Sequence, residues 1–453
     1  MPIHPIEYRY GSEEMRRIWD RREWLRRMVK VEAALLKALA EAGVVPSEAA
    51  EKVWTVVENE AVTLEAVNRW ERITDHEVVA VVKALAEVSG VYGGYIHLGA
   101  TSNDITDTVL ATQLRDSINL IMRRLKDLAS VLSELAEKYR DLVCLGRTHG
   151  VAALPITLGF KFAVYAAEVV RHIDRLREAK PRVCVGKMSG AVGTMASFGE
   201  KGFQIQKRVM ELMGVEEPLI ATQVVPRDGL AEFITLAAMI ASTLDKIANE
   251  IRNLQRTEIR EVEEPFREES QVGSSTMPHK RNPIKCEKVC GLAKVLRSEA
   301  LAALENVVLE HERDLTNSSC ERVIVPEVCL LLDEQLRTLV KVLRGLRVYP
   351  ENIRRNLDSM RGLIMSEAVM MAMVSKGADR QWAHEVVRRC SMEAWRTGKH
   401  LKDVLTANQE VRRYLTAEEV ERVMKPENYI GTAREQVDRV VTYIREKLKT
   451  LAL

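Results

Sequence analysis

The stretch DITDTVLATQLRDSINLIMRRLKDLASVLSELAEKY, residues 104–139, decides the fold class, because it contains neither glycine nor proline. Side chains that can form one buried stripe recur in it at the three- to four-residue spacing of an α-helix. The stripe consists of Ile105, Val109, Ser117, Ile121, Leu125, Leu128, Leu132 and Leu135. At ~1.5 Å per residue, such a helix is roughly 50 Å long. A helix of this length needs other long helices against which to bury its stripe.

Four further segments have the composition and spacing of long helices. They are residues 155–179, 229–259, 283–309 and 326–346. Five long helices predict an all-α fold built on a central bundle, with shorter helices before and after it. We expect three regions: an N-terminal helical domain (1–103), a central long-helix bundle (104–349) and a C-terminal helical domain (350–453).

Composition excludes several classes of protein. The chain is 46% hydrophobic and 29% charged, and its net charge is only +2, from 67 Lys and Arg against 65 Asp and Glu. The apolar fraction is too high for a disordered chain, and the charge balance argues against bulk electrostatic binding of nucleic acid. No apolar stretch approaches the ~18–20 residues of a membrane span, and the N-terminus has no signal-peptide centre. We therefore expect a cytoplasmic protein.

The seven cysteines favour buried free thiols, because their number is odd and the chain is large. Cys286 and Cys290 are four residues apart, but no second pair completes a zinc site. Structural disulfides are the alternative. Abundant charge and arginine, with few Asn and Gln, are typical of thermophilic proteins, and hyperthermophiles can carry intracellular disulfides.

Four connections between helices carry polar residues that could form a site. They are 97–104, 146–150, 273–283 and 311–322. Thr101 and Ser102 can cap the long helix or bind a carboxylate at its N-terminus. His149 lies between glycines in a loop, where it is either structural or a proton donor near neutral pH. Arg313 and Arg322 form either an exposed ion-pair cluster or a phosphate site.

The segment GSSTMPHKRNP, residues 273–283, is the most specific of these motifs. It resembles the Gly-Ser-Ser-x-Met-Pro-x-Lys-x-Asn-Pro signature of the fumarase/aspartase superfamily at every fixed position. Within that superfamily the chain is similar to the adenylosuccinate lyase family, through His279 and Arg281 in the loop and through the segments around Thr101, His149 and Arg313.

The resemblance implies the all-helical, three-domain lyase fold and β-elimination of fumarate from succinylated purine nucleotides. It also implies a homotetramer whose active sites are shared between subunits, and it implies neither a cofactor nor a metal ion. By the same resemblance, Ser274 is the general base and His149 the general acid. Lys280 and the helix N-terminus at Pro283 would stabilise the serine alkoxide.

The family's other site residues carry over onto matching positions. Glu287 would pair with the catalytic histidine, and His76 would be a second active-site histidine. The substrate would contact Arg9, Tyr10, Thr101, Ser102, Gln223, Asn282, Arg313, Ser318 and Arg322. One departure stands beside His76: close relatives tend to carry a basic residue just before it, whereas here Asp75 and Glu77 place acidic residues on both sides.

Two alternatives remain at the level of sequence. One is another lyase of the same fold, such as a carboxymuconate cycloisomerase, and the other is a non-enzymatic structural homologue. The first would not need the phosphate cluster around Arg313, and the second would not need Ser274, His149 and Lys280.

Overall fold

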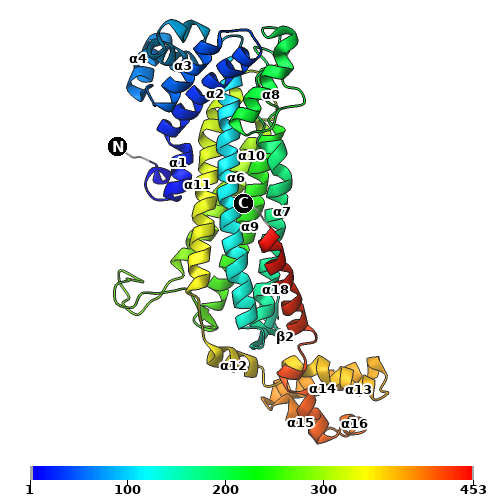
Figure 1. Ribbon diagram of the computed structural model, residues 1–453. Coiled ribbons are helices and arrows are strands. Elements are labelled where there is room, and N and C mark those ends of the chain that lie inside the picture. Colours follow the sequence, from blue (N-terminus) through cyan, green and yellow to red (C-terminus); the bar gives the residue numbers. More distant parts are fainter. Residues whose placement is uncertain (1–3, 451–453) are drawn as a thin grey trace.

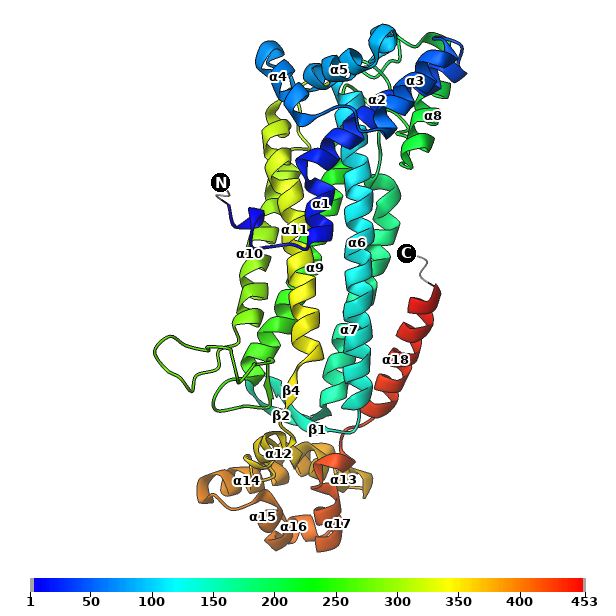
Figure 2. The same ribbon diagram turned by 60° about the vertical axis from the view of Figure 1, so that its left-hand side comes forward.

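Five long helices form an elongated bundle at the centre of the chain, and smaller helical regions lie at its two ends (Figure 1). This computed structural model describes residues 4–450. The bundle helices are α6 (Ser102–Lys138), α7 (Leu158–Val183), α9 (Asp228–Leu254), α10 (Ile284–Glu305) and α11 (Thr316–Arg344). Helices α6, α9 and α11 run from the upper to the lower end in Figure 2, whereas α7 and α10 return. The predicted all-α, long-helix fold is confirmed.

The central core forms where the apolar stripes of these helices meet. Every residue of the stripe predicted on residues 104–139 is buried. From Ile121 onward the stripe belongs to one core with apolar residues of α7, α9 and α11, including Val169, Ile240 and Leu336, whereas its first two residues, Ile105 and Val109, belong to the core of the upper region. The hydrophobic pattern therefore determines both the helix and its buried face.

Two of the long helices begin elsewhere than predicted. α7 begins at Leu158, because residues 151–157 form a strand, and it continues through Pro181 to Val183. α11 begins at Thr316 and contains Pro326 in its interior. The hydrogen bond lost at Pro326 is outweighed by burial of the neighbouring Ile324, Val325 and Val328.

A β-hairpin that the helical pattern did not predict connects α6 to α7 at the lower end. Strands β1 (Val143–Thr148) and β2 (Val151–Thr157) pair antiparallel, with Thr148 opposite Val151. The two residues of the turn, His149 and Gly150, have φ of 55° and 76°. Tight hairpin turns of type I′ need positive φ at both central positions, and this need accounts for the glycine after His149. A shorter pair, β3 (Val262–Glu263) and β4 (Arg347–Val348), lies at the same end.

The upper region is a small helical layer with its own hydrophobic core. This region contains α2 (Arg21–Glu41), α3 (Ser47–Glu58), α4 (Leu64–Thr74) and α5 (Glu77–Val88), whereas the preceding α1 (Glu13–Trp19) buries Met15 in the central core. Helix α8 (Gly202–Met213), from the middle of the chain, packs into this core through Ile205 and Val209.

The lower region has a third core. It contains α12 (Pro350–Asp358), α13 (Ser366–Ser375), α14 (Arg380–Thr397), α15 (Leu401–Ala407), α16 (Gln409–Arg412) and α17 (Ala417–Val423). The last helix, α18 (Ala433–Thr450), returns to the bundle and buries Val437, Val441 and Ile444 there. The domain boundaries at 103/104 and 349/350 remain a proposal, supported by the three separate cores, although α8 and α18 cross them.

All seven cysteines are free thiols, and six of them are buried. Burial raises the pKa of Cys144 and of Cys184 to about 12 in each case. The interpretation as buried thiols therefore fits the structure, and the disulfide alternative does not. None of the helices within residues 4–450 is both long and apolar enough to cross a membrane.

Candidate active site

The predicted site residues fall into two groups at opposite ends of the bundle, with a third pair between them. The upper group lies around the starts of α5, α6, α9 and α11 and comprises His76, Thr101, Ser102, Gln223, Arg313, Ser318 and Arg322. The lower group lies on the β1–β2 turn, the loop before α10 and the first turn of α10. It comprises His149, Ser274, Lys280, Asn282 and Glu287.

At the upper end, His76 caps α5 and faces Ser102 at the start of α6. Its Nδ1 accepts the backbone N–H of Val79 at 3.4 Å, so its Nε2 is the nitrogen directed toward Ser102 Oγ, at 3.5 Å. An Nδ1 that accepts a hydrogen bond leaves the proton on Nε2. This capping bond therefore fixes the tautomer of His76.

Two arginines of the predicted phosphate cluster already have partners. Arg322 forms an ion pair with Glu77 at 2.6 Å, and Arg313 donates to the side-chain oxygen of Gln223 at 3.0 Å. Glu77 is one of the two acidic neighbours of His76, so the departure noted in the sequence bears directly on the arginine cluster. Asp75, the other neighbour, ends α4 with a left-handed φ of 48°.

Buried ion pairs and hydrogen bonds hold the upper group of site residues in place. Asp104 accepts the backbone N–H groups of Thr101, Ser189 and Gly190 at 2.8–3.0 Å, and it forms an ion pair with the fully buried Lys187. These contacts join the start of α6 to the loop that follows α7.

A second buried network joins three bundle helices. Arg227 binds both oxygens of Asp107, at 3.0 and 2.9 Å, and Glu321 at 2.9 Å. Although burial opposes its charge, the two carboxylates raise the pKa of Arg227. Asp107 also accepts the N–H of Val225 at 2.8 Å, which fixes the loop that carries Gln223.

Sequence reasoning missed Asp104 and Asp107 as supporting residues. Both belong to the long predicted helix and are buried among its apolar neighbours. An acidic residue that is buried beside an apolar stripe needs a charged or hydrogen-bonding partner. Its place in the helical pattern was therefore the one signal in the sequence that could have indicated a supporting role. The partners come from other helices, so the sequence could not name them.

At the lower end, Ser274 lies in the extended loop between β3 and α10. Its Oγ accepts the backbone N–H groups of Met277 and Thr276, at 3.0 and 3.3 Å. Asn282 donates to the carbonyl of Gly273 at 2.9 Å and closes the loop. A Cβ on Gly273 would lie 1.9 Å from the carbonyl oxygen of Lys280, so only glycine allows this close approach. The Lys280 side chain is exposed, with no side-chain partner within residues 4–450.

The start of α10 is not free to stabilise a serine alkoxide, contrary to our expectation. The nearly buried carboxylate of Glu264 accepts the N–H groups of Lys285 and Cys286, each at 3.1 Å. The two amides that donate to Ser274 Oγ come instead from its own loop.

His149 is exposed at the tip of the β1–β2 hairpin. The hairpin is anchored by Arg147, which pairs with the buried Glu261 at 2.5 Å, and Glu261 is held by Asn356 at 2.9 Å. No hydrogen bond or ion pair within residues 4–450 joins His149 to Glu287 or to Ser274. The structure therefore presents these three groups at one end of the molecule without joining them.

The two ends are too far apart to act on one small molecule. Helix α6, which begins at Ser102 and leads to the hairpin, has 37 residues. At ~1.5 Å per residue it separates the ends by roughly 55 Å. Arg9 and Tyr10 lie beside the middle of α11, where Gly11 packs on Leu330 and Ser12 donates to Asp333 at 2.7 Å. A single chain thus presents three separated parts of the predicted site.

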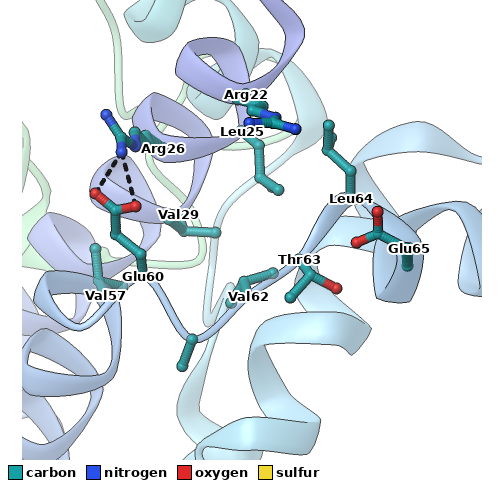
Figure 3. A pocket seen from close by; sticks show the side chains of 11 residues that line it. Arg22, Leu25, Arg26, Val29, Val57, Glu60, Val62, Thr63, Leu64 and Glu65 are labelled. Carbon is teal, nitrogen blue, oxygen red and sulfur yellow. Dashed lines mark hydrogen bonds and ion pairs between the residues drawn. The ribbon is translucent and has the colours of Figure 1, made fainter.

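A pocket of about 260 Å³ lies elsewhere, among α2, the end of α3 and the start of α4 (Figure 3). Its apolar wall includes Leu25, Val29 and Val62, and its rim carries the Arg26–Glu60 ion pair at 2.6 Å. It contains none of the predicted site residues. Within residues 4–450, no cluster of His, Cys, Asp and Glu has the makeup of a metal site.

Comparison with known proteins establishes the family. Residues 7–297 match the family model described as lyase, and residues 362–440 match the model described as adenylosuccinate lyase C-terminus. The chain belongs to the lyase family.

Individual relatives narrow this class. The chain is 54% identical over 446 residues to the adenylosuccinate lyase of Pyrococcus abyssi, covering 98% of this chain and 99% of that protein. Among solved structures, it resembles a fumarate lyase from Mesorhizobium sp. BNC1, with a TM-score of 0.89, 33% identity and coverage of 97% and 100%. It resembles equally the 3-carboxy-cis,cis-muconate lactonizing enzyme from Pseudomonas putida, with a TM-score of 0.89, 33% identity and coverage of 98% and 99%.

Proposed function

We propose that this enzyme eliminates fumarate from adenylosuccinate, giving AMP, and from the succinylated aminoimidazole carboxamide ribotide of purine synthesis. The observation that carries the proposal is the match along nearly the whole chain to a lyase of that name, together with the match of residues 362–440 to the C-terminal model of the same enzyme. The upper site residues support it, because two arginines and hydroxyl groups suit a substrate with one phosphate and two carboxylates.

The reaction needs a base, an acid and a group of anion-binding residues. The base removes a proton from the carbon next to a carboxylate, and the electron pair left behind forms the new C=C bond. This C=C bond forms as the C–N bond breaks; the electron pair of the C–N bond stays on the purine nitrogen, and the acid protonates that nitrogen. The products are fumarate and the purine nucleotide, with no change of oxidation state that would need a redox cofactor.

Ser274 is the base in this proposal. A serine hydroxyl is a weak acid, so its alkoxide must be stabilised before it can accept a proton from carbon. The amides of Met277 and Thr276 already donate to its Oγ, and these bonds strengthen when the oxygen becomes anionic. Lys280, six residues along the same loop, adds positive charge.

His149 is the acid, and its position on the hairpin tip suits transfer of a proton to a group outside its own chain. A carboxylate beside a histidine stabilises the protonated ring. Glu287 is assigned this role. Because no contact within one chain joins them, the pair would form when copies associate.

The separation of the site residues supports shared active sites. Catalytic groups must lie within about 3 Å of the atoms on which they act, whereas α6 alone places the two ends roughly 55 Å apart. Antiparallel association of copies would bring the upper end of one chain to the lower ends of others. A homotetramer, as the superfamily resemblance implies, provides this arrangement.

The carbon–nitrogen lyase reaction is favoured over that of a muconate-type enzyme, although the fold resembles that of a muconate lactonizing enzyme. A carboxymuconate substrate has no phosphate, so the Arg313–Ser318–Arg322 cluster would have no ligand. We also infer a location in the cytoplasm, because the proposed substrates are charged nucleotides.

Fumarate release from adenylosuccinate by the purified protein, without added metal or cofactor, tests the proposal. Release by the wild type that is lost in Ser274→Ala is the expected result. An assembled, folded protein that releases no fumarate at either 25 °C or an elevated temperature would refute the assigned substrate.

A further inference from the structure

A buried carboxylate and a histidine form an isolated pair beside the upper part of the site. Glu32, on α2, has a fully buried side chain, and its Oε1 lies 2.7 Å from Nδ1 of His97. Its Oε2 has no hydrogen-bond partner within residues 4–450. An ionised carboxylate buried with one polar partner is stable only if that partner is cationic or donates strongly. The pair therefore favours the protonated imidazole.

His97 belongs to the loop that delivers Thr101 and Ser102 to the start of α6. Its backbone is left-handed, with φ of 64°, a conformation that is costly for a residue other than glycine. The loop is fixed in place, because Ser197 donates to the carbonyl of Gly99 at 2.5 Å and a Cβ on Gly99 would collide with the Phe198 ring. The surrounding structure thus retains a strained residue four positions before the predicted carboxylate-binding hydroxyls.

The charged groups around His97 are few and come from three elements. Glu32 faces it from α2, Asp104 faces it from α6, and Lys187 from the loop after α7 is already paired with Asp104. Burial acts against protonation, but the hydrogen bond and charge of Glu32, with the charge of Asp104, outweigh it and raise the pKa of His97 above its usual value. Because Nδ1 faces the buried carboxylate and the side chain is 23% exposed, Nε2 is the nitrogen available to a ligand.

We propose that Glu32 is a positioning residue of the active site, which fixes His97 so that its protonated Nε2 donates to a substrate carboxylate bound at Thr101 and Ser102. The substrate in this statement rests on the proposed function. A hydrogen bond from a cation to a carboxylate is about twice as strong as one from a neutral donor. Glu32 thereby adds a positive charge to a subsite whose hydroxyls are neutral, without contacting the substrate itself.

The first test is Glu32→Gln, which keeps the shape and an acceptor for Nδ1–H but removes the charge. Loss of a hydrogen bond to a charged group weakens binding about tenfold or more. We expect KM for adenylosuccinate to rise by up to about tenfold, most at alkaline pH, and kcat to change less. The difference in KM between Glu32→Gln and the wild type should narrow toward pH 6, where the His97 ring is protonated even without the Glu32 carboxylate. A KM that changes equally at all pH values, or not at all, would overturn the proposal.

A double variant separates positioning from general destabilisation. His97→Asn should raise KM without the pH dependence, and adding Glu32→Gln to it should change KM no further. Additive effects of the two substitutions would mean that Glu32 does not act through His97, and would refute the proposal. His172→Gln is the matched control, because it removes a buried imidazole between α7 and α9, away from this loop. It should leave the pH dependence of KM unchanged.

A chemical measurement on the intact enzyme makes failure of this proposal distinguishable from failure of the proposed function. Diethyl pyrocarbonate reacts with neutral imidazole, so the pH dependence of His97 modification, read by mass spectrometry, reports its protonation without any substrate. Glu32→Gln should move this profile to lower pH. An unchanged profile would overturn the inference even if the wild type cleaves adenylosuccinate. A shifted profile in a protein that does not cleave it would refute only the assigned substrate.

Discussion

Acid should destabilise this protein through His172, a histidine buried between α7 and α9. Its Nε2 lies 2.9 Å from Thr243 Oγ1, and Arg175 donates to its Nδ1 at 3.3 Å. Burial, followed by the charge of Arg175, lowers the pKa of His172 to about 4. The folded protein therefore holds this ring neutral over a pH range in which the unfolded chain protonates it.

The direction and size of the effect follow from proton linkage. In the unfolded chain the histidine takes up its proton near pH ~6.5. Because the unfolded state binds more protons between pH ~6.5 and ~4, the free energy of unfolding falls as the pH falls through this window. At about 1.4 kcal/mol per pKa unit, protonation of His172 in the unfolded chain lowers the free energy of unfolding relative to neutral pH. The decrease is about 1 kcal/mol at pH ~5.5 and about 3 kcal/mol at pH ~4.

The assay compares the wild type with His172→Gln at one protein concentration, because association of copies also contributes to stability. Urea unfolding would be measured at pH 7.5, 5.5 and 4.5. The variant should be less stable than the wild type at pH 7.5 but should lose less stability as the pH falls. His384→Gln, at an exposed histidine of α14, is the control and should retain the wild-type pH slope. Identical slopes in the wild type and His172→Gln would refute the reasoning.

The remaining predictions concern the site. Ser274→Ala and His149→Ala should each reduce kcat about 10²-fold or more without unfolding the protein, as expected for positioned acid–base groups. Fumarate release above a tenth of the wild-type rate in either would contradict its role. Mixing Ser274→Ala with Ser102→Ala should restore activity if one site takes residues from opposite ends of different chains, whereas mixed oligomers that stay inactive would argue against sharing. Arg227→Met leaves Asp107 and Glu321 buried without a cation, so the free energy of unfolding should fall by about 3–5 kcal/mol. A thermal unfolding midpoint equal to that of the wild type would show that the network adds no stability.

Much of the fold could be predicted from local pattern. The stripe on residues 104–139 determined the longest helix, its buried face and the need for a bundle, because helical periodicity is a property of neighbouring residues. The same local reasoning missed the β1–β2 hairpin. The helix predicted for residues 155–179 begins inside the strand 151–157, and only pairing with residues 143–148 makes this segment a strand.

The sequence by itself predicted the candidate residues of the site, because the motif at 273–283 matches a signature that has each residue type at a fixed position. Only the tertiary structure decided which of them lie together. It places His76 beside Ser102 and Arg322 beside Glu77, and it surrounds Asp104 and Asp107 with donors from distant parts of the chain. It also separates Ser274 from the upper residues by the length of a bundle helix. The physical reason is that a motif records side-chain chemistry along one segment, whereas distances between segments depend on the packing of whole helices.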